Sequence, residues 1–294
     1  MSAWTKFRDG LVAKIKRLLG IAEEEPEKNS AAGTAEGEAC EGNRAREEPE
    51  AAPAPSSAPP AWDKAVHASC WDGDNAQKRM MNILSPGFSD SKFAEYAAWM
   101  KSRGCDAAHV FLVNQGDGEG AGQNCATNKS HAALAKKRIE ALRKDGFAVV
   151  PWIIADDSDE WLKDLFAHPE ERVKALADAG LFDDASYVVV GLEMDEAGSA
   201  CDKSWAAVAA ALRRHYKGKL GTHHKSGNSF AYAGLGEIVL GQLDPGCSTS
   251  DIKKQISAIK AKGKAAVGFE YARSPDRAKA QAALDAGAIG VGNW

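Results

Sequence analysis

A repeated alternation of short apolar segments with amphipathic segments constrains the fold of this chain more than any other feature. The segment from Tyr187 to Leu192 is the clearest, because three successive valines are expected of a strand buried on both faces of a parallel sheet. Because the strands alternate with predicted helices, we expect an α/β protein. The predicted strands span Met81 to Leu84, His109 to Val113, Phe147 to Ile154, Tyr187 to Leu192, Leu220 to His223, Glu237 to Gly241, Ala265 to Phe269 and Ala288 to Val291.

Helices are predicted between most of these strands, and glycines mark their ends. The helices span Ser91 to Ser102, His131 to Lys144, Trp161 to Ala179, Ser204 to Tyr216, Asp251 to Lys262 and Pro275 to Ala286. Ser130 and Ser274 are candidate N-caps for two of them. Glycines stand where a left-handed C-cap residue is wanted, at Gly104, Gly146, Gly180, Gly218, Gly263 and Gly287.

This pattern predicts a (β/α)8 TIM barrel. Eight strands alternating with helices over about 215 residues fit that fold, whose usual length is about 250 residues. A doubly wound open sheet is the alternative, but no glycine-rich turn follows the first predicted strand. Lys225 to Gly236 is short and rich in glycine, which predicts a loop. The sequence stops at Trp294, directly after the last predicted strand, so we expect the eighth helix to be missing.

Two segments are predicted to precede the barrel, which we assign to residues 62–294. In residues 1–20 an apolar stripe beside basic residues predicts an amphipathic helix, with the stripe formed by Trp4, Phe7, Leu11, Ile15 and Leu18. Such a helix could dock on a virion protein or a membrane surface, or stay frayed without a partner. Residues 21–61 are rich in proline and glutamate and poor in large apolar side chains, which predicts a disordered linker.

Composition narrows the classes of function. The formal net charge is -4 and the predicted barrel is nearly neutral, which argues against a nucleic-acid-binding surface. The sequence shows neither an apolar run long enough to span a membrane nor a signal-peptide pattern, so we expect a cytoplasmic or virion-associated protein. The 6 cysteines form no C-x-x-C pair and no dense cluster, which favours free thiols.

Polar residues follow nearly every predicted strand. Because ligands bind at the carboxyl ends of barrel strands, we expect a binding site there. The candidate substrate-binding residues are Asn114, Trp152, Asp156, Asp195, His223, His224, Gln242, Tyr271 and Trp294. Only one of the adjacent His223 and His224 can face the interior of the barrel, since neighbouring strand residues point to opposite faces. Phe230 and Tyr232 are expected to add aromatic surface near the mouth, and flat apolar faces suit sugar rings.

Glu193 ends the fourth predicted strand and Glu270 ends the seventh, so their exits face each other across the mouth of the barrel. Glycoside hydrolysis needs two carboxyls on either side of the scissile bond. Here the chain resembles the clan of retaining (β/α)8 glycoside hydrolases, with Leu192 where that clan usually has Asn. The resemblance implies Glu193 as the general acid/base, Glu270 as the nucleophile and Trp294 as a sugar platform. Two segments also resemble barrel proteins encoded in phage and bacterial genomes. They are Gly-Phe-Glu-Tyr-Ala-Arg at 268–273 and Ala-Gly-Ala-Ile-Gly-Val-Gly-Asn at 286–293.

Other functions remain open at this point. A non-catalytic carbohydrate-binding protein, or a phage virion structural protein, could use the same barrel, and Glu270 could then simply pair with Arg273. Asp195 and Glu196 could be solvated or helix-capping acids, or either could replace Glu193. A metal-dependent hydrolase could use His223 or His224 with Asp156, Glu193 or Asp244, although no H-x-H or H-E-x-x-H motif is present. We predict no cofactor and no metal.

Overall fold

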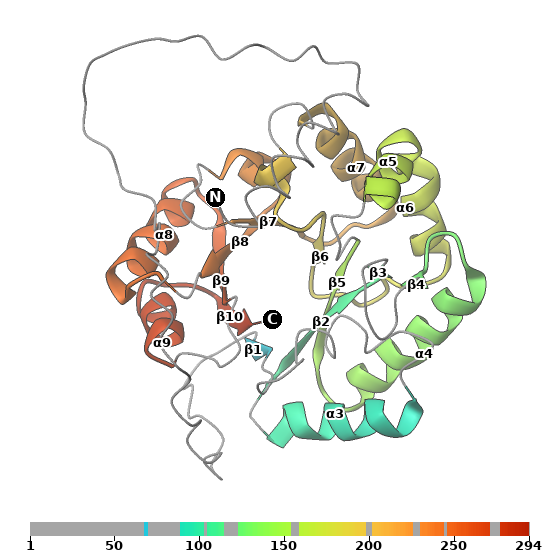
Figure 1. The fold of residues 1–294 in the computed structure, drawn as a ribbon, viewed down its shortest axis with the longest axis horizontal. Helices are drawn as coiled ribbons and strands as arrows, with labels where there is room; N and C mark the ends of the chain where they lie inside the picture. Colours follow the sequence, from blue (N-terminus) through green and yellow to red (C-terminus); the bar gives the residue numbers. More distant parts are fainter. Residues whose placement is uncertain are drawn as a thin grey trace.

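The computed structural model describes residues 68–69, 89–102, 105–114, 123–153, 159–197, 202–225, 230–243, 246–270 and 277–293. Within these ranges, parallel strands form an 8-stranded sheet that curls into a barrel, which confirms the predicted fold class (Figure 1). In chain order the strands are β1 (Ala68–Ser69), β2 (Ala107–Phe111), β5 (Ala148–Trp152), β6 (Val188–Val189), β7 (Leu220–His224), β8 (Ile238–Leu243), β9 (Ala265–Glu270) and β10 (Gly290–Asn293). β10 pairs with β1, and β1 lies beside β2 at the other edge of the sheet.

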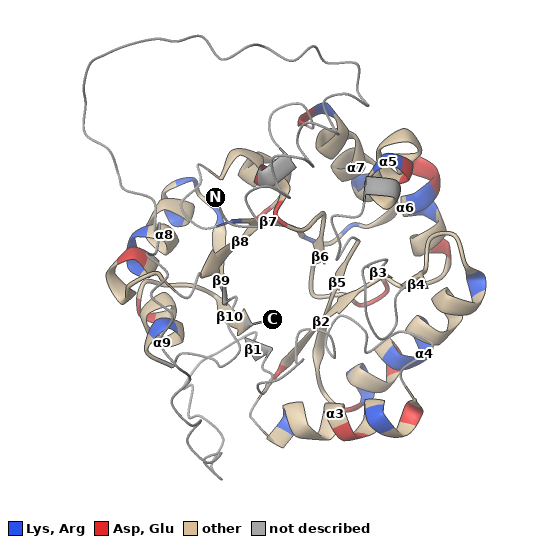
Figure 2. Ribbon diagram, viewed as in Figure 1, with Lys and Arg blue, Asp and Glu red and all other residues tan. Residues whose placement is uncertain are grey.

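Helices surround the sheet, and their Lys, Arg, Asp and Glu residues are coloured around the outside of the ring in Figure 2. They are α3 (Asp90–Ser102), α4 (Lys129–Lys144), α5 (Asp159–Ala167), α6 (Pro169–Asp178), α7 (Asp202–His215), α8 (Thr249–Ala261) and α9 (Arg277–Asp285). Two short 3-10 helices, η1 (Met194–Ala197) and η3 (Ala231–Leu235), follow β6 and β7. A small antiparallel hairpin, β3 (Val113–Asn114) with β4 (Gln123–Asn124), follows β2.

The alternation of side chains along the strands produces two apolar layers. One layer fills the barrel interior and contains Phe111, Val150, Trp152, Tyr187, Val189, Ile238, Leu240 and Val267. The intervening residues, such as Val149 and Val239, pack outward against the helices. Trp161 and Trp205 are 1% exposed and belong to the outer apolar layer between the helices and the sheet.

The predicted helix ends are confirmed at several glycines. Gly146, Gly180, Gly263 and Gly287 all have positive φ. Gly218 does not: a Cβ there would lie 2.1 Å from the Tyr216 hydroxyl, so this glycine is needed for space instead. Gly104 and Ser274 lie outside the described residues. The prediction that Ser130 caps a helix is wrong. The N-cap of α4 is Asn128, whose side chain accepts hydrogen bonds from the backbone N–H groups of Ser130 and His131.

Three predicted elements differ in the structure. The first barrel position is held by Ala68–Ser69, whereas the predicted first strand, 81–84, lies outside the described residues. The predicted helix 161–179 is split into α5 and α6, because Pro169 has no backbone N–H to continue α5. The predicted loop 225–236 contains the short helix η3, with Phe230 in the left-handed region before it.

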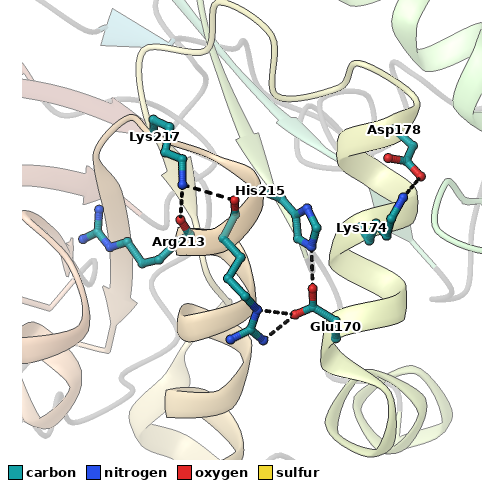
Figure 3. A network of polar contacts seen from close by, with 7 residues as sticks. Glu170, Lys174, Asp178, Arg213, His215 and Lys217 are labelled. Carbon is teal, nitrogen blue, oxygen red and sulfur yellow. Dashed lines mark hydrogen bonds and ion pairs between the residues drawn. The ribbon is translucent and has the colours of Figure 1, made fainter.

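Charged side chains link α6 to α7 on the surface (Figure 3). Glu170 of α6 accepts hydrogen bonds from Arg214 and His215 at the end of α7, while Lys174 pairs with Asp178 along α6. The hydrogen bonds from Arg214 and His215 hold the pKa of Glu170 below its ordinary value. This network therefore fixes the C-terminal end of α7 against α6.

The predicted N-terminal helix (1–20) and linker (21–61) lie outside the described residues. Among the helices that are described, none is both long and apolar enough to cross a membrane. Cys105 is disulfide-bonded, in contrast to the free thiol expected from the sequence. Wide cysteine spacing leaves no recognisable framework, so the sequence pattern could not reveal this bond.

Candidate active site

Glu193 lies in the turn between β6, the fourth strand of the barrel, and the short helix η1. Its φ is 41°, in the left-handed region that residues other than glycine rarely occupy. Its backbone N–H donates to Nδ1 of His223 on β7 at 2.9 Å. The residue is half-buried. Backbone strain of this kind is maintained only by the surrounding structure, and it is concentrated at functional sites.

The two adjacent histidines of β7 point to opposite faces, as predicted. The ring of His223 lies inside the barrel, with its centroid 5.3 Å from that of Trp152. The ring of His224 lies outside it, against Phe230 at 5.5 Å and Tyr232 at 6.1 Å. Both histidines are 0% exposed. His223 is therefore the member of the pair that belongs to the barrel interior.

Asp195 contacts the outward-facing histidine. Its side chain is 7% exposed, and its Oδ2 lies 3.8 Å from Nδ1 of His224. Its Oδ1 accepts the backbone N–H of Lys225 at 3.0 Å. On the far side of the ring, Nε2 of His224 lies 3.1 Å from the Thr222 hydroxyl. The carboxylate of Asp195 thus ties η1 to the end of β7.

Burial determines the protonation of both rings. It lowers the pKa of His223 well below its ordinary value, and the neighbouring His224 and His109 lower it further. A neutral imidazole carries a proton on only one of its two nitrogens. Because Nδ1 of His223 accepts the Glu193 N–H, the proton of His223 is on Nε2. Burial lowers the pKa of His224 to about 4. The contact between His224 and Asp195 is therefore one between a neutral imidazole and a carboxylate at neutral pH.

A buried aromatic and imidazole cluster lies beneath the Glu193 turn. The indole N–H of Trp152 donates to Nδ1 of His109 at 2.9 Å, and the Trp152 ring meets Phe111 edge-on at 5.1 Å. The His109 ring also lies 6.1 Å from Tyr187. His109 was missed by the sequence analysis. A lone histidine in the middle of an apolar strand was the available signal.

The predicted aromatic surface at the mouth needs correction at three positions. Trp152 is 0% exposed, because its ring is packed between strands in the interior layer. Phe230 precedes η3 and Tyr232 lies within it, on the outer side of β7, and the Tyr232 hydroxyl donates to Asp202 at 2.7 Å. Tyr271 and Trp294 lie outside the described residues.

The remaining predicted site residues are placed less fully. Gln242 is 3% exposed on β8, and its backbone is in register with Phe269 of β9. Glu270 is the last residue of β9, in register with Leu243 and Asn293, and its side chain is not among the described ones. Asn114 lies on β3, and its side chain is likewise not among the described ones. Asp156 lies outside the described residues.

In the part of the chain that the structure describes, no group of three or more His, Cys, Asp and Glu side chains comes together as a metal site. The described site therefore offers half-buried Glu193, supported by His223 and the buried cluster around Trp152. A half-buried carboxyl at a strand exit can exchange protons with a bound ligand.

Comparison with known proteins supports the fold. No family model matches the sequence, and no curated protein matches it. Among solved structures, a GH113 β-1,4-mannanase is similar with a TM-score of 0.53 at 13% identity, over 79% of this chain and 88% of that one. The GH53 catalytic domain of Ignisphaera aggregans has a TM-score of 0.52 at 12% identity, over 81% and 87% of the two chains. A GH18 chitinase from Pseudoalteromonas aurantia has a TM-score of 0.51 at 9% identity, over 78% and 93%.

These likenesses are of fold. The chain has the (β/α)8 barrel found in several families of glycoside hydrolases, and the resemblance noted in the sequence is confirmed at that level. The identities are too low to transfer any residue's role from one chain to the other.

Proposed function

We propose that this protein is a glycoside hydrolase in which Glu193 is the general acid/base and Glu270 the nucleophile. The observation that carries the proposal is the Glu193 turn: a half-buried glutamate at the exit of the fourth barrel strand, in a strained conformation fixed by a buried histidine. Strained residues supported in this way cluster at active sites. The barrel fold shared with a mannanase and a chitinase adds weight to it.

The chemistry follows from two carboxyl groups. Protonated Glu193 donates its proton to the leaving-group oxygen as the glycosidic bond breaks, while ionised Glu270 attacks the anomeric carbon. Water, deprotonated by Glu193, then releases the sugar from Glu270. Two inversions at the anomeric carbon leave its configuration unchanged, so we infer a retaining enzyme. A separation of about 5 to 5.5 Å between the two carboxyl groups is required for this route.

The proposal is tested with the full chain on a glycan panel that contains β-1,4-mannan, chitin oligosaccharides and peptidoglycan. Glu193→Gln and Glu270→Gln should each lower kcat by a factor of about 10² to 10⁴. For Glu193→Gln, the loss should shrink on aryl glycosides, because a good leaving group needs no proton. Glu140→Gln, on the exposed face of α4, is the matched control and should retain activity.

Two outcomes would contradict the assignment. Full activity in both active-site variants would remove the two glutamates from the mechanism. Glycan binding without cleavage, unchanged in both variants, would instead identify a carbohydrate-recognition protein on the same barrel.

A further inference from the structure

His223 has a specific geometric relation to the turn that carries Glu193. Its Nδ1 accepts the Glu193 backbone N–H at 2.9 Å, across 30 residues of sequence. Buried backbone N–H groups are normally satisfied by carbonyl oxygens in helices, sheets and turns. Here a side chain on the next strand supplies the acceptor, so the position of the turn depends on the identity of one residue of β7.

The acceptor is itself held rigidly. His223 is 0% exposed and its ring packs on Trp152, with an interplanar angle of 52°. The indole N–H of Trp152 on β5 donates to His109 on β2, so the support extends from β7 through β5 to β2. A hydrogen-bond acceptor fixed by packing on a buried ring has few alternative positions.

The same turn is anchored from the other side of β7. Met194 is 0% exposed in the outer apolar layer, and Asp195 accepts the Lys225 N–H and faces His224. Glu193 is thus held by the inward-facing His223, and Asp195 contacts the outward-facing His224. Two adjacent residues of β7 hold the turn on opposite faces of the strand.

We propose that His223 is a positioning residue that sets the conformation of the Glu193 turn by accepting its backbone N–H through an unprotonated Nδ1. The inference rests on the proposed function in so far as Glu193 is taken to be catalytic. It goes beyond that function by assigning a role to a residue that need not touch the substrate. The left-handed φ of Glu193 is maintained by this bond.

The matched pair of variants is His223→Asn and His223→Leu. The Asn side-chain oxygen lies close to the place of Nδ1 and can accept the same N–H, whereas Leu has nearly the same shape as Asn without an acceptor. In His223→Leu, amide hydrogen exchange at Glu193 should accelerate by at least about tenfold, because a part-buried N–H loses its partner. His223→Asn should retain most of the protection.

Activity gives a second, separable readout. With a glycan that the wild type cleaves, His223→Leu should lower kcat by about tenfold or more with little change in KM, and His223→Asn should restore most of it. Equal losses in both variants, or unchanged kcat in His223→Leu, would overturn the positioning role. If the wild type cleaves no glycan, the proposed function fails, and exchange at Glu193 still decides the role of His223.

A direct measurement needs no variant. In the ¹⁵N-labelled full chain, a scalar coupling across the hydrogen bond should connect the Glu193 amide nitrogen to Nδ1 of His223, and the proton should reside on Nε2. A protonated Nδ1, or the absence of that coupling in an assigned spectrum, would overturn the inference even if His223→Leu failed to fold.

Discussion

The indole N–H of Trp152 on β5 donates to Nδ1 of His109 on the neighbouring strand β2, at 2.9 Å. Both side chains point into the barrel, two residues out of register with each other along the strands. This diagonal contact is a polar link in a mainly apolar layer, and the Trp152 ring centroid lies 5.3 Å from that of His223. The interior of this barrel is therefore organised by direction-specific bonds as well as by packing.

Trp152→Phe should destabilise the protein by more than packing alone requires. The substitution removes the indole and leaves the His109 acceptor without its donor, which costs about 1 to 3 kcal/mol in addition to the lost volume. Trp161→Phe is the matched control, because Trp161 is equally buried but its indole N–H has no partner within the described structure. Urea unfolding of both variants measures the difference. Equal losses would show that the bond to His109 contributes nothing.

Gly191→Ala should disturb the Glu193 turn from a distance of two residues. A Cβ at Gly191 would lie 2.6 Å from the ring of Trp205, which is buried on α7 and has no room to move. We expect a loss of about 1 to 3 kcal/mol from overpacking, together with reduced activity. Gly234→Ala is the control, since nothing lies within 4 Å of its Cβ position, and it should be close to neutral. Similar stabilities for the two variants would contradict the close approach of Gly191 to Trp205.

Acid should destabilise the fold through His224. Its pKa is lowered from 6.5 to about 4, chiefly by burial, so the unfolded chain binds a proton that the folded chain does not accept. The free energy of unfolding should therefore fall as the pH drops through this window, by about 3 kcal/mol in total. The lowered pKa of His223 acts in the same direction.

The measurement is urea unfolding at a series of pH values between about 7 and about 4. His224→Gln removes one of the titrating groups and keeps a group in reach of Thr222, so its stability should fall less steeply with acid. Identical slopes for this variant and the wild type would show that His224 is not buried in its neutral form.

Asp164→Asn should weaken the junction between α5 and α6. The Asp164 carboxylate accepts two hydrogen bonds from Arg172, at 2.6 and 2.8 Å, across the break that Pro169 introduces. These bonds lower the pKa of Asp164, and both side chains are less than one-third exposed. We expect a loss of about 0.5 to 1 kcal/mol, measured by thermal unfolding. Asp178→Asn breaks the exposed pair with Lys174 within α6 (Figure 3) and should leave the melting temperature unchanged.

Most of the repeated strands could be predicted because a short apolar run is followed by an amphipathic helix. Leu220 to His223, Glu237 to Gly241 and Ala265 to Phe269 all lie within two residues of the observed strands. β1 could not be found in this way. It has only two residues, Ala68 and Ser69, and its place is set by pairing with β10, which no local pattern records.

The site was predictable only in part. Alternation along a strand correctly predicted that His223 and His224 face opposite ways, because that geometry is local. It could not show that Asp195 would turn back to meet His224 or that the Glu193 N–H would find His223, since both contacts depend on how η1 folds over β7. Trp152 was misplaced at the surface because its neighbours in space come from distant parts of the chain.

The pairing of β1 with β10 has a consequence for how the protein is made. A ribosome delivers the chain from its N-terminus, at about 5 to 20 residues per second, so β1 is synthesised well before its partner strand at residues 290–293. During that interval the strands from β2 to β9 can assemble only an open arc with two unsatisfied edges. Until residues 290–293 are synthesised, the open edge of β9 can pair with strands of other chains, so association between incomplete chains should be strongest in this interval.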